Sequence, residues 1–578
     1  MLNLIDTPFS YYGSYMAIAF YDYHLSYHGI ITNPKGDGLY LKSVKGKSRD
    51  CTGVFKLIPY CNGKEADYSI VYDYHEIKLI GKQFIIKICF VNDSNVILHV
   101  KGKNISLVLD TLPQSKYDYS LKLNDGTEDY YVINSYKSQT KYFVSCSKDM
   151  NLKQQYADDM QGSSESKFEI NGDEFDIIVQ DIPTHINKRE KIAFTYEKYA
   201  QHAKNYFEEY SLRFPKPLSQ YSQTYVDVIY TTWSATVKPE GLLKRYSTYI
   251  SNTFFPGIWS WDHCFNSIGL MGSDNELAYN NMMIVYDFQD QYGQLPGSMN
   301  DSNIHWNFAK PPIQGLFISK MMQDIDFDEN QYEDIYDKLY KQINYWLEYH
   351  DCNNDGIPEY HHGNDSGYDN STVFINNFVV DSPDLTAYLI RGLETLEKIA
   401  LLLHKDYLKI QSQKKKLIEL FKEHFIVDDC IIARETVTQK IIKSDSILPY
   451  ASLVIAKYLP ENIVSKMINE LKTEFMTEYG FATEKTTSPF YESDGYWRGP
   501  IWASEMIVLI DSLDEIGENE LVKEIIIKFL NIIKREGFAE NFDAQTGTGL
   551  RDPAYTWTSS GFIYLHNKLK KIIEKSSL

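Results

Sequence analysis

The chain has 578 residues, more than a single hydrophobic core usually serves, so at least two domains are expected. Its formal net charge of -20 repels phosphate groups, which argues against nucleic acid and anionic membrane surfaces as partners and favours neutral small ligands. No apolar run reaches the length of a membrane span, and the start lacks the charged opening of a secretory signal. Seven cysteines without paired spacing predict reduced thiols and a cytoplasmic protein.

Residues 1–187 are predicted to form an antiparallel β-sandwich domain. Short segments rich in Ile, Val and Tyr alternate with turns rich in Asn, Asp, Gly and Lys, and they lie at 83–91, 95–109, 129–136 and 174–181. No helical stretch interrupts these segments, which is typical of a separate β domain. The region contains no spacing typical of a nucleophile, a metal site or a phosphate loop, so it is assigned no chemistry.

The hydrophobic period becomes helical after this region. Residues 188–218 are charged and amphipathic at their start and are predicted to form a helical linker, and residues 219–578 are predicted to be mostly helical. The absence of a fixed sequence repeat disfavours a solenoid, and about a dozen helices favour an (α/α)6 barrel, a closed double ring. The clearest helices are expected at 329–350, 382–403, 408–424, 447–459, 460–475, 502–516, 518–536 and 558–575.

Two long loops carry the candidate catalytic groups. Residues 361–374 (HHGNDSGYDNSTVF) contain Asp369, and residues 537–550 (GFAENFDAQTGTGL) contain Glu540. A ring of helices could bring both loops to one end of the barrel. A carboxylate pair across a cleft suits glycoside hydrolysis, in which one acid protonates the leaving oxygen and the other group activates water or attacks carbon. Acidic residues in such loops are also ordinary turn formers, so spacing alone does not decide.

Three further stretches combine aromatic and polar side chains that suit a sugar, because aromatic rings contact its apolar faces and polar groups bind its hydroxyls. These candidate substrate-binding residues are Trp259, Trp261 and Asp262 within 254–266, Lys310 and Gln314 within 305–314, and Trp497 and Arg498 within 495–502. Structural roles are the alternative. Asp262 could cap the helix that follows it, and Arg498 could tie a loop through an ion pair.

Taken together, these motifs resemble those of glycoside hydrolase family 63. The family and its relatives include processing α-glucosidases, bacterial α-glucosidases and mannosylglycerate hydrolases, and the trehalases are more distantly similar. The resemblance covers most of the chain from about 250 to 562, with the β region and linker placed as in the family. The motifs are WSWD at 259–262, SGYDNS at 366–371, GYWRGPIW at 495–502, AENFDAQTG at 539–547 and PAYTWTSSGF at 553–562.

The resemblance implies an inverting, α-glucosidase-like glycoside hydrolase that needs no cofactor and acts on a neutral glycoside or oligosaccharide. It places Asp369 at the general-acid position and Glu540 at the general-base position. The chain is much shorter than the eukaryotic processing enzymes, so their oligosaccharide specificity is not transferred. Sugar-binding roles are implied for Trp259, Trp261, Asp262, Trp497 and Trp557, and also for Lys310, Gln314 and Arg498.

A second constellation lies just before the first catalytic loop. Residues 351–359 (DCNNDGIPE) place oxygen-bearing side chains at alternate positions around Gly356, as in the first part of a calcium loop. The carboxylate usual at the twelfth position is replaced by His362, and Asn-Asp-Gly is also a common turn. A structural calcium ion therefore stands as one interpretation and a plain turn as the other. The candidate ligands are Asp351, Asn353, Asp355 and Glu359.

Two other functions are considered beside glycoside hydrolysis. A sugar epimerase or isomerase is the first alternative, because helical double rings host these enzymes as well. Such enzymes typically use histidine bases, whereas the motifs here supply carboxylates and tryptophans. A carbohydrate-binding protein without activity ranks last, because both carboxylates are present. The sequence sets no expectation for the number of subunits.

Overall fold

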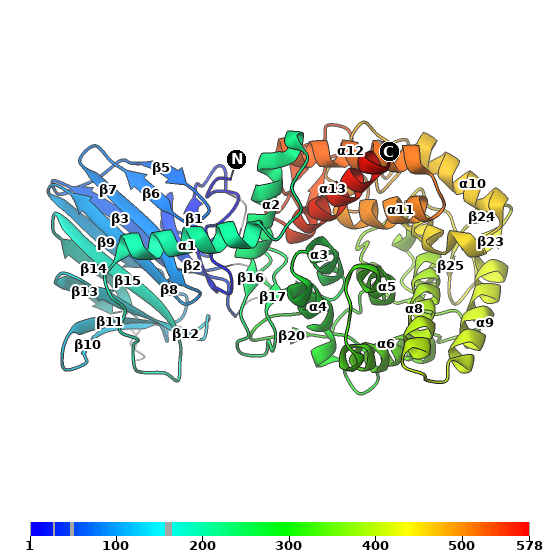
Figure 1. Ribbon diagram of the computed structural model, residues 1–578, viewed down its shortest axis with the longest axis horizontal. Coiled ribbons are helices and arrows are strands. Elements are labelled where there is room, and N and C mark those ends of the chain that lie inside the picture. Colours follow the sequence, from blue (N-terminus) through cyan, green and yellow to red (C-terminus); the bar gives the residue numbers. More distant parts are fainter. Residues whose placement is uncertain (1, 27–28, 47–50, 157–163, 577–578) are drawn as a thin grey trace.

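The computed structural model describes residues 2–26, 29–46, 51–156 and 164–576, which form a sheet domain and a helical domain side by side (Figure 1). The sheet domain contains two antiparallel sheets. One has the strand order β1-β2-β3-β9-β14-β13, with β4 paired to β3, and the other has the order β10-β11-β12-β15-β8-β7-β6-β5. The predicted N-terminal antiparallel sandwich is thereby confirmed.

Alternation of side chains explains how the larger sheet is covered on both faces. On β8, Val96, Leu98 and Val100 point into the main core, while Ile97 points to the opposite face and packs beside the first helix. The strands are β1 (Met16–Tyr21), β2 (Gly38–Ser43), β3 (Thr52–Cys61), β4 (Lys64–Glu65), β5 (Ser69–Tyr72), β6 (Ile77–Ile80), β7 (Phe84–Asn92), β8 (Asn95–Gly102), β9 (Ile105–Thr111), β10 (Tyr119–Asn124), β11 (Asp129–Ser135), β12 (Thr140–Cys146), β13 (Met150–Tyr156), β14 (Ser164–Asn171) and β15 (Glu174–Pro183).

The single strand expected at 95–109 is wrong, because two strands occupy this segment. The chain turns at Asn104, whose φ of 51° lies in the left-handed region that asparagine tolerates. β8 therefore pairs within the larger sheet and β9 within the smaller one. A local pattern of apolar residues does not reveal such a change of sheet.

The linker helix is shorter than expected. Helix α1 (Tyr196–Ser211) begins eight residues after the predicted start, and the segment 188–195 is not helical. Ile192 and Phe194 of that segment pack against the outward face of the sheet instead. Figure 1 shows α1 lying along the sheet and reaching toward the helical domain.

Six helical segments of the second domain form a closed inner ring. In order of contact they are α3, α5, α8, η4, α11 and α13, and α13 returns to α3. Six outer helices, α2, α4, α6, α9, α10 and α12, pack against this ring, so the described residues confirm the predicted (α/α)6 barrel. Inner helices are buried nearly all round, as in α11, whereas outer ones such as α6 bury one stripe.

The helices match the predicted spans closely, because their apolar periodicity is strong. Their bounds are α2 (Ser222–Ser234), α3 (Asp262–Leu270), α4 (Asn275–Met283), α5 (Gln314–Asp324), α6 (Glu329–Tyr349), α7 (Gly363–Ser366), α8 (Pro383–Leu402), α9 (Leu408–Phe425), η4 (Leu448–Tyr458), α10 (Glu461–Glu470), η5 (Leu471–Phe475), α11 (Ala503–Glu515), α12 (Asn519–Glu536) and α13 (Thr556–Ser576). Three short 3-10 turns are η1 (Ser219–Tyr221), η2 (Tyr286–Phe288) and η3 (Thr372–Phe374).

Short antiparallel ladders tie the long loops of the barrel together. The ladder β27-β28-β29 pairs Trp502 with Asn541, which brings the GYWRGPIW loop beside Glu540. The short strands are β16 (Thr236–Val237), β17 (Ser247–Thr248), β18 (Ile258–Trp259), β19 (Ser298–Met299), β20 (Ile304–His305), β21 (Glu359–Tyr360), β22 (Val380–Asp381), β23 (Ile426–Val427), β24 (Cys430–Ile431), β25 (Ala433–Glu435), β26 (Ile441–Ile442), β27 (Ile501–Trp502), β28 (Asn541–Phe542) and β29 (Gly549–Leu550).

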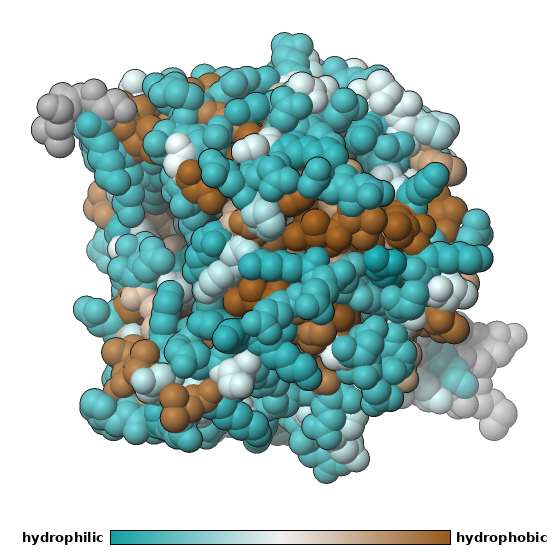
Figure 2. Space-filling view, turned by 90° about the vertical axis from the view of Figure 1, so that its right-hand side faces the viewer, coloured by the Kyte–Doolittle hydropathy of each residue, from teal (hydrophilic) through white to brown (hydrophobic). Residues whose placement is uncertain are grey.

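The surface at the far end of the helical domain is mixed in polarity. Figure 2 shows hydrophilic side chains over most of this face and apolar side chains gathered in a band across it. None of the helices in the described part of the chain combines the length and apolar character that crossing a bilayer requires. None of the seven cysteines, all of which lie in the described part of the chain, forms a disulfide.

Candidate active site

A cavity of about 340 Å³ lies where the five sequence motifs converge. Three of the motifs lie at the start of an inner helix, since α3, α11 and α13 begin within or directly after them, and α5 begins at the end of the stretch 305–314. The starts of these helices therefore gather the motifs at one mouth of the barrel. The volume of the cavity is at the lower end of the range for small-molecule sites. Its aromatic lining consists of Phe255, Trp259, Trp261, Phe308, Tyr496, Trp497, Trp502, Tyr555 and Trp557.

The aromatic side chains form a packed wall. Trp497 and Trp502 stack with ring centroids 4.1 Å apart and planes within 5°, and Trp557 meets Trp502 edge-on at 5.4 Å. Trp261 in turn meets Trp557 edge-on at 5.7 Å. Rings locked by one another in this way offer a rigid apolar surface of the kind that a sugar ring contacts.

Asp369 lies at the edge of this cavity, with about a quarter of its side chain exposed. The Nζ atom of Lys310 lies 3.2 Å from Asp369 Oδ1 and donates a second hydrogen bond to the carbonyl oxygen of Asn364. The Asn364 amide, oriented to satisfy its neighbours, donates to both carboxylate oxygens at 2.7 Å. Tyr496 Oη lies 3.4 Å from Oδ2. Three side chains therefore hold the orientation of this carboxyl group.

Glu540 is the buried member of the pair, with 4% of its surface exposed. Burial, aided by the nearby charge of Asp552, raises its pKa from 4.5 to about 8. Trp557 Nε1 donates to the Glu540 backbone carbonyl at 3.2 Å, and the Glu540 backbone N–H donates to the Asp552 carbonyl at 2.7 Å. These bonds fix the backbone while the side chain lines the cavity.

A third carboxyl group, Asp262, lines the same cavity. Burial raises its pKa to about 7 even though Lys310 opposes the shift, and Tyr555 Oη donates to its Oδ1 at 3.1 Å. The N-cap position of α3 is Trp261, and Asp262 is the first residue of the helix, with its side chain in the lining of the cavity.

Two of the predicted sugar-binding residues lie outside the lining of this cavity. Gln314 is buried, donates to the carbonyl of Ser260 and accepts from Gln342 Nε2 at 2.6 Å, so its amide is used within the fold. Arg498 donates from Nη2 to Glu492 Oε1 at 3.0 Å and lines a neighbouring cavity. The other predicted residues, including Trp259, Trp497 and Trp557, are brought together as expected.

Several residues of the site were not predicted from the sequence, among them Tyr496, Tyr555 and Asn364. Each of these three lies in or beside a quoted motif but belongs to a type that is common in loops, so no spacing marked it. Tyr496 has a left-handed backbone with a φ of 64°, a conformation that costs energy for a large side chain. Its hydroxyl reaches Asp369 from this position. The strained backbone conformation therefore places the Tyr496 hydroxyl, a hydrogen-bond donor, beside the Asp369 carboxylate.

Gly367 lets the Asp369 loop pack against the aromatic wall. It ends the short helix α7 with a φ of 80°, and a Cβ atom added there would lie 2.7 Å from the Trp261 ring. Replacing Gly367 by Ala should therefore cost both backbone strain and a clash, together about 2–5 kcal/mol of unfolding free energy. Urea unfolding measures the loss, and displacement of Trp261 should also lower turnover.

Gly272 offers a matched control for that variant. Its φ of 74° is similar, but no atom lies within 4 Å of an added Cβ, so Gly272→Ala isolates the backbone strain. This control should lose about 1–2 kcal/mol. Equal losses in the two variants would show that contact with Trp261 does not restrict position 367.

The predicted calcium ligands form a hydrogen-bonded turn. Asp351 accepts the backbone N–H groups of Asp355 and Gly356 at 3.0 Å, and Glu359 accepts that of Cys352 at 3.1 Å. Asn353 donates to Asp355 Oδ2 at 2.9 Å, so these ligand oxygens have partners within the turn. This arrangement accounts for the motif by turn formation, and binding of calcium stays a prediction.

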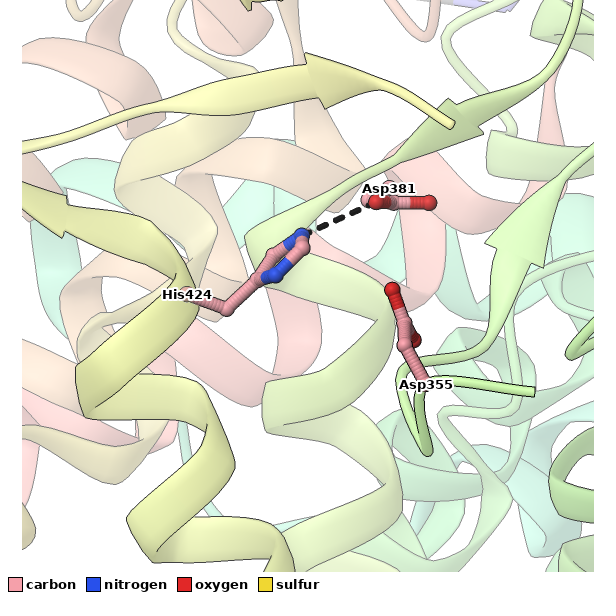
Figure 3. Close-up of side chains that lie close together, drawn as sticks. All are labelled: Asp355, Asp381 and His424. Carbon is pink, nitrogen blue, oxygen red and sulfur yellow. Dashed lines mark hydrogen bonds and ion pairs between the residues drawn. The ribbon is translucent and has the colours of Figure 1, made fainter. Parts of the chain in front are cut away.

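Asp355 also lies near two side chains outside the motif, Asp381 and His424 (Figure 3). His424 Nε2 lies 2.9 Å from Asp381 Oδ2, and Asp381 also accepts hydrogen bonds from Thr436 Oγ1 and Gln439 Nε2. These bonds satisfy the buried Asp381 carboxylate. These hydrogen bonds join β22 to α9 and to the segment that follows β25, and they account for the cluster without a bound ion.

Comparison with known proteins places this site in a family. The sequence profile described as the mannosylglycerate hydrolase MGH1-like glycoside hydrolase domain matches residues 255–558, which include both candidate catalytic loops. The chain belongs to this family of glycoside hydrolases. The MGH1-like domain coincides with the helical barrel, and the cavity lies within it.

Similar proteins agree with this family. The chain is 32% identical to a mannosylglycerate hydrolase of Thermus thermophilus over 74 residues, which cover 13% of this chain and 18% of that relative. It is 27% identical over 82 residues to mannosylglycerate hydrolase MGH2 of Selaginella moellendorffii, covering 14% of this chain and 17% of the relative. The sequence matches thus span less than a fifth of these relatives.

A solved structure shares the fold. The crystal structure of a family 63 mannosylglycerate hydrolase from Thermus thermophilus, in complex with glucose, superimposes with a TM-score of 0.52 and 18% identity. The superposition covers 98% of that chain and 59% of this one. The likeness supports the barrel fold of this MGH1-like enzyme.

Proposed function

We propose that this MGH1-like glycoside hydrolase cleaves α-glycosidic bonds with inversion, using Asp369 as general acid and Glu540 as general base. The observation that carries the proposal is the convergence of both carboxyl groups on one aromatic-walled cavity of about 340 Å³. Motif similarity supplies the assignment of the two roles. Hydrolysis needs no further cofactor, because these two groups and a water molecule can supply every proton transfer.

The proposed reaction moves two protons. The Asp369 carboxyl group donates its proton to the glycosidic oxygen as the bond from that oxygen to the anomeric carbon breaks. Glu540, as the carboxylate, takes a proton from the water that attacks the same carbon from the opposite face. Lys310, Asn364 and Tyr496 hold the acid in orientation, which is the positioning that such catalysis requires.

The lining of the cavity suits a neutral α-glucoside or α-mannoside, because aromatic rings contact the apolar face of a sugar and polar groups bind its hydroxyls. Asp262, Asp369 and Glu540 line the cavity, and Lys310, the cation in the lining, is already bound to Asp369 and Asn364. Burial raises the pKa of Asp262 to about 7 and that of Glu540 to about 8, so near neutral pH these groups are protonated to a large extent and donate hydrogen bonds to hydroxyls. Mannosylglycerate, which carries a carboxylate, is the second candidate because the family and the relatives are named for it.

A substrate panel tests the proposal and separates the two candidates. It contains neutral α-glucosides, neutral α-mannosides, their β-linked counterparts and mannosylglycerate, with release of free sugar as the measurement. We expect hydrolysis of neutral α-linked substrates and none of β-linked ones. Turnover of mannosylglycerate above that of every neutral substrate would make it the preferred substrate. Isomerised sugar without hydrolysis would support an epimerase or isomerase, and binding without turnover would indicate an inactive binding protein.

The stereochemistry of the product tests the mechanism. Attack by water from the face opposite the leaving group inverts the anomeric carbon, so an α-linked substrate should release the β-sugar first. Proton NMR of the earliest product, recorded before mutarotation, measures the anomer directly. A retaining control enzyme on the same substrate should give the α-anomer. An initial α-anomer from this protein would recast Glu540 as a nucleophile.

A further inference from the structure

Three cavities follow one another from the aromatic wall to the outer face of the catalytic loop. Asp369 lines both the 340 Å³ cavity and a second cavity of about 330 Å³. Ile375, Asn377 and Phe378 line both this second cavity and a third one of about 1080 Å³. The proposed proton donor therefore stands between the sugar cavity and the second cavity, which adjoins the larger third one.

Aromatic side chains mark the path between these cavities. Phe308 of the first cavity packs against His362 of the second with ring centroids 5.2 Å apart, and His362 stacks on Phe378 at 6.3 Å. Phe490 lies farther along, in the third cavity. The row thus runs from the mouth of the sugar cavity outward.

The exposure of these rings is unusual for this protein. Phe308, Phe378 and Phe490 are 37%, 70% and 46% exposed, and they are the exposed phenylalanines among the described residues. All three line the connected cavities. Exposed apolar rings that gather in one groove are typical of a binding surface, because they lose free energy by remaining in water.

The polar lining of the third cavity suits an uncharged ligand rich in hydroxyl groups. The lining contains four lysines and four acidic residues, so its formal charges cancel and do not favour an ionic ligand. Hydroxyl side chains in the lining add further hydrogen-bond donors and acceptors. The charged residues are Lys440, Lys443, Lys466, Lys485, Asp429, Glu435, Asp445 and Glu470. Together with the aromatic row, this composition matches the two surfaces of a sugar, its apolar face and its hydroxyl edge.

We propose that the second and third cavities form a leaving-group groove that binds the remaining sugar units of a neutral α-linked oligosaccharide. The inference rests on the proposed function, since a general acid must face the leaving oxygen and the leaving group must therefore extend past Asp369. The groove continues from that point over Phe378 toward Phe490. The substrate is accordingly longer than a disaccharide.

Chain length tests the groove. We expect kcat/KM on α-linked gluco- or manno-oligosaccharides to rise from two to four units. Phe378→Ala and Phe490→Ala should each lower the ratio of kcat/KM for the tetramer to that for the dimer by roughly fivefold, the loss of one aromatic contact. Tyr292→Ala is the matched control, because Tyr292 is 54% exposed but lies outside the three cavities, and its ratio should stay unchanged.

Binding supplies a readout that does not depend on turnover. In the Glu540→Gln background, titration calorimetry with the dimer and the tetramer should give tighter binding of the tetramer, and Phe378→Ala should remove the difference. Hydrolysis of short α-glycosides with no effect of chain length would overturn the groove and leave the proposed function intact. Loss of hydrolysis on all glycosides would instead contradict the proposed function. Tetramer binding that Phe378→Ala leaves unchanged would also refute the groove.

Discussion

Replacing Asp369 by Asn is expected to lower turnover of an α-linked disaccharide by about 10²–10⁴-fold, because the leaving sugar then departs without a proton. A glycosyl fluoride should lose far less, since fluoride leaves readily without protonation. The Asn side chain keeps the size of the group held by Lys310 and Asn364, so substrate binding should persist. The measurement is kcat on both substrates, with folding checked by circular dichroism.

Two companion variants make this result specific. Glu540→Gln should lower turnover of both substrates, because a water molecule must be activated in each case. Asp406→Asn, at an exposed position before α9 and outside the cavities, controls for an acidic side chain lost elsewhere. If Asp369→Asn loses turnover of the glycosyl fluoride and of the disaccharide equally, Asp369 is not the general acid. If Glu540→Gln, and not Asp369→Asn, loses disaccharide turnover while keeping fluoride turnover, the two roles are exchanged.

The second large effect is a gain in stability on removing the buried Glu540 charge. The pKa of this group is about 8 in the folded protein and near 4.5 in an unfolded chain. Between these values the folded state holds a proton that the unfolded state has lost, so the unfolding free energy falls as pH rises. Glu540→Gln removes this slope. The variant should match the wild type near pH 4 and exceed it by a few kcal/mol at pH 8–9.

Urea unfolding at several pH values measures this difference. Asp262→Asn provides a parallel case, because burial raises the pKa of Asp262 to about 7 and its gain should be complete at a lower pH. The raised pKa of Glu540 also affects activity, because a general base must be ionised to accept a proton. We therefore expect kcat/KM to rise as the pH approaches 8. A stability difference between Glu540→Gln and wild type that stays constant with pH would show that the carboxyl group is not buried as the structure places it.

Features that depend on local pattern were predictable from the amino-acid sequence. Strong apolar periodicity located the barrel helices, as in α6, where residues four apart share one buried face. Five motifs with distinctive residue order carried the family resemblance, and the matched domain at 255–558 agrees with it. Both candidate catalytic residues and most of the aromatic wall were found in this way.

Features that depend on long-range packing became visible only in the folded chain. The change of sheet at Asn104 and the use of Gln314 within the fold are set by partners far away in the sequence. The raised pKa of Glu540 arises from burial, which no single loop reveals. The aromatic row from Phe308 to Phe378 likewise exists because separate loops meet at one mouth of the barrel. Periodicity is a property of neighbours along the chain, whereas cavities, burial and electrostatics arise only when distant segments pack together.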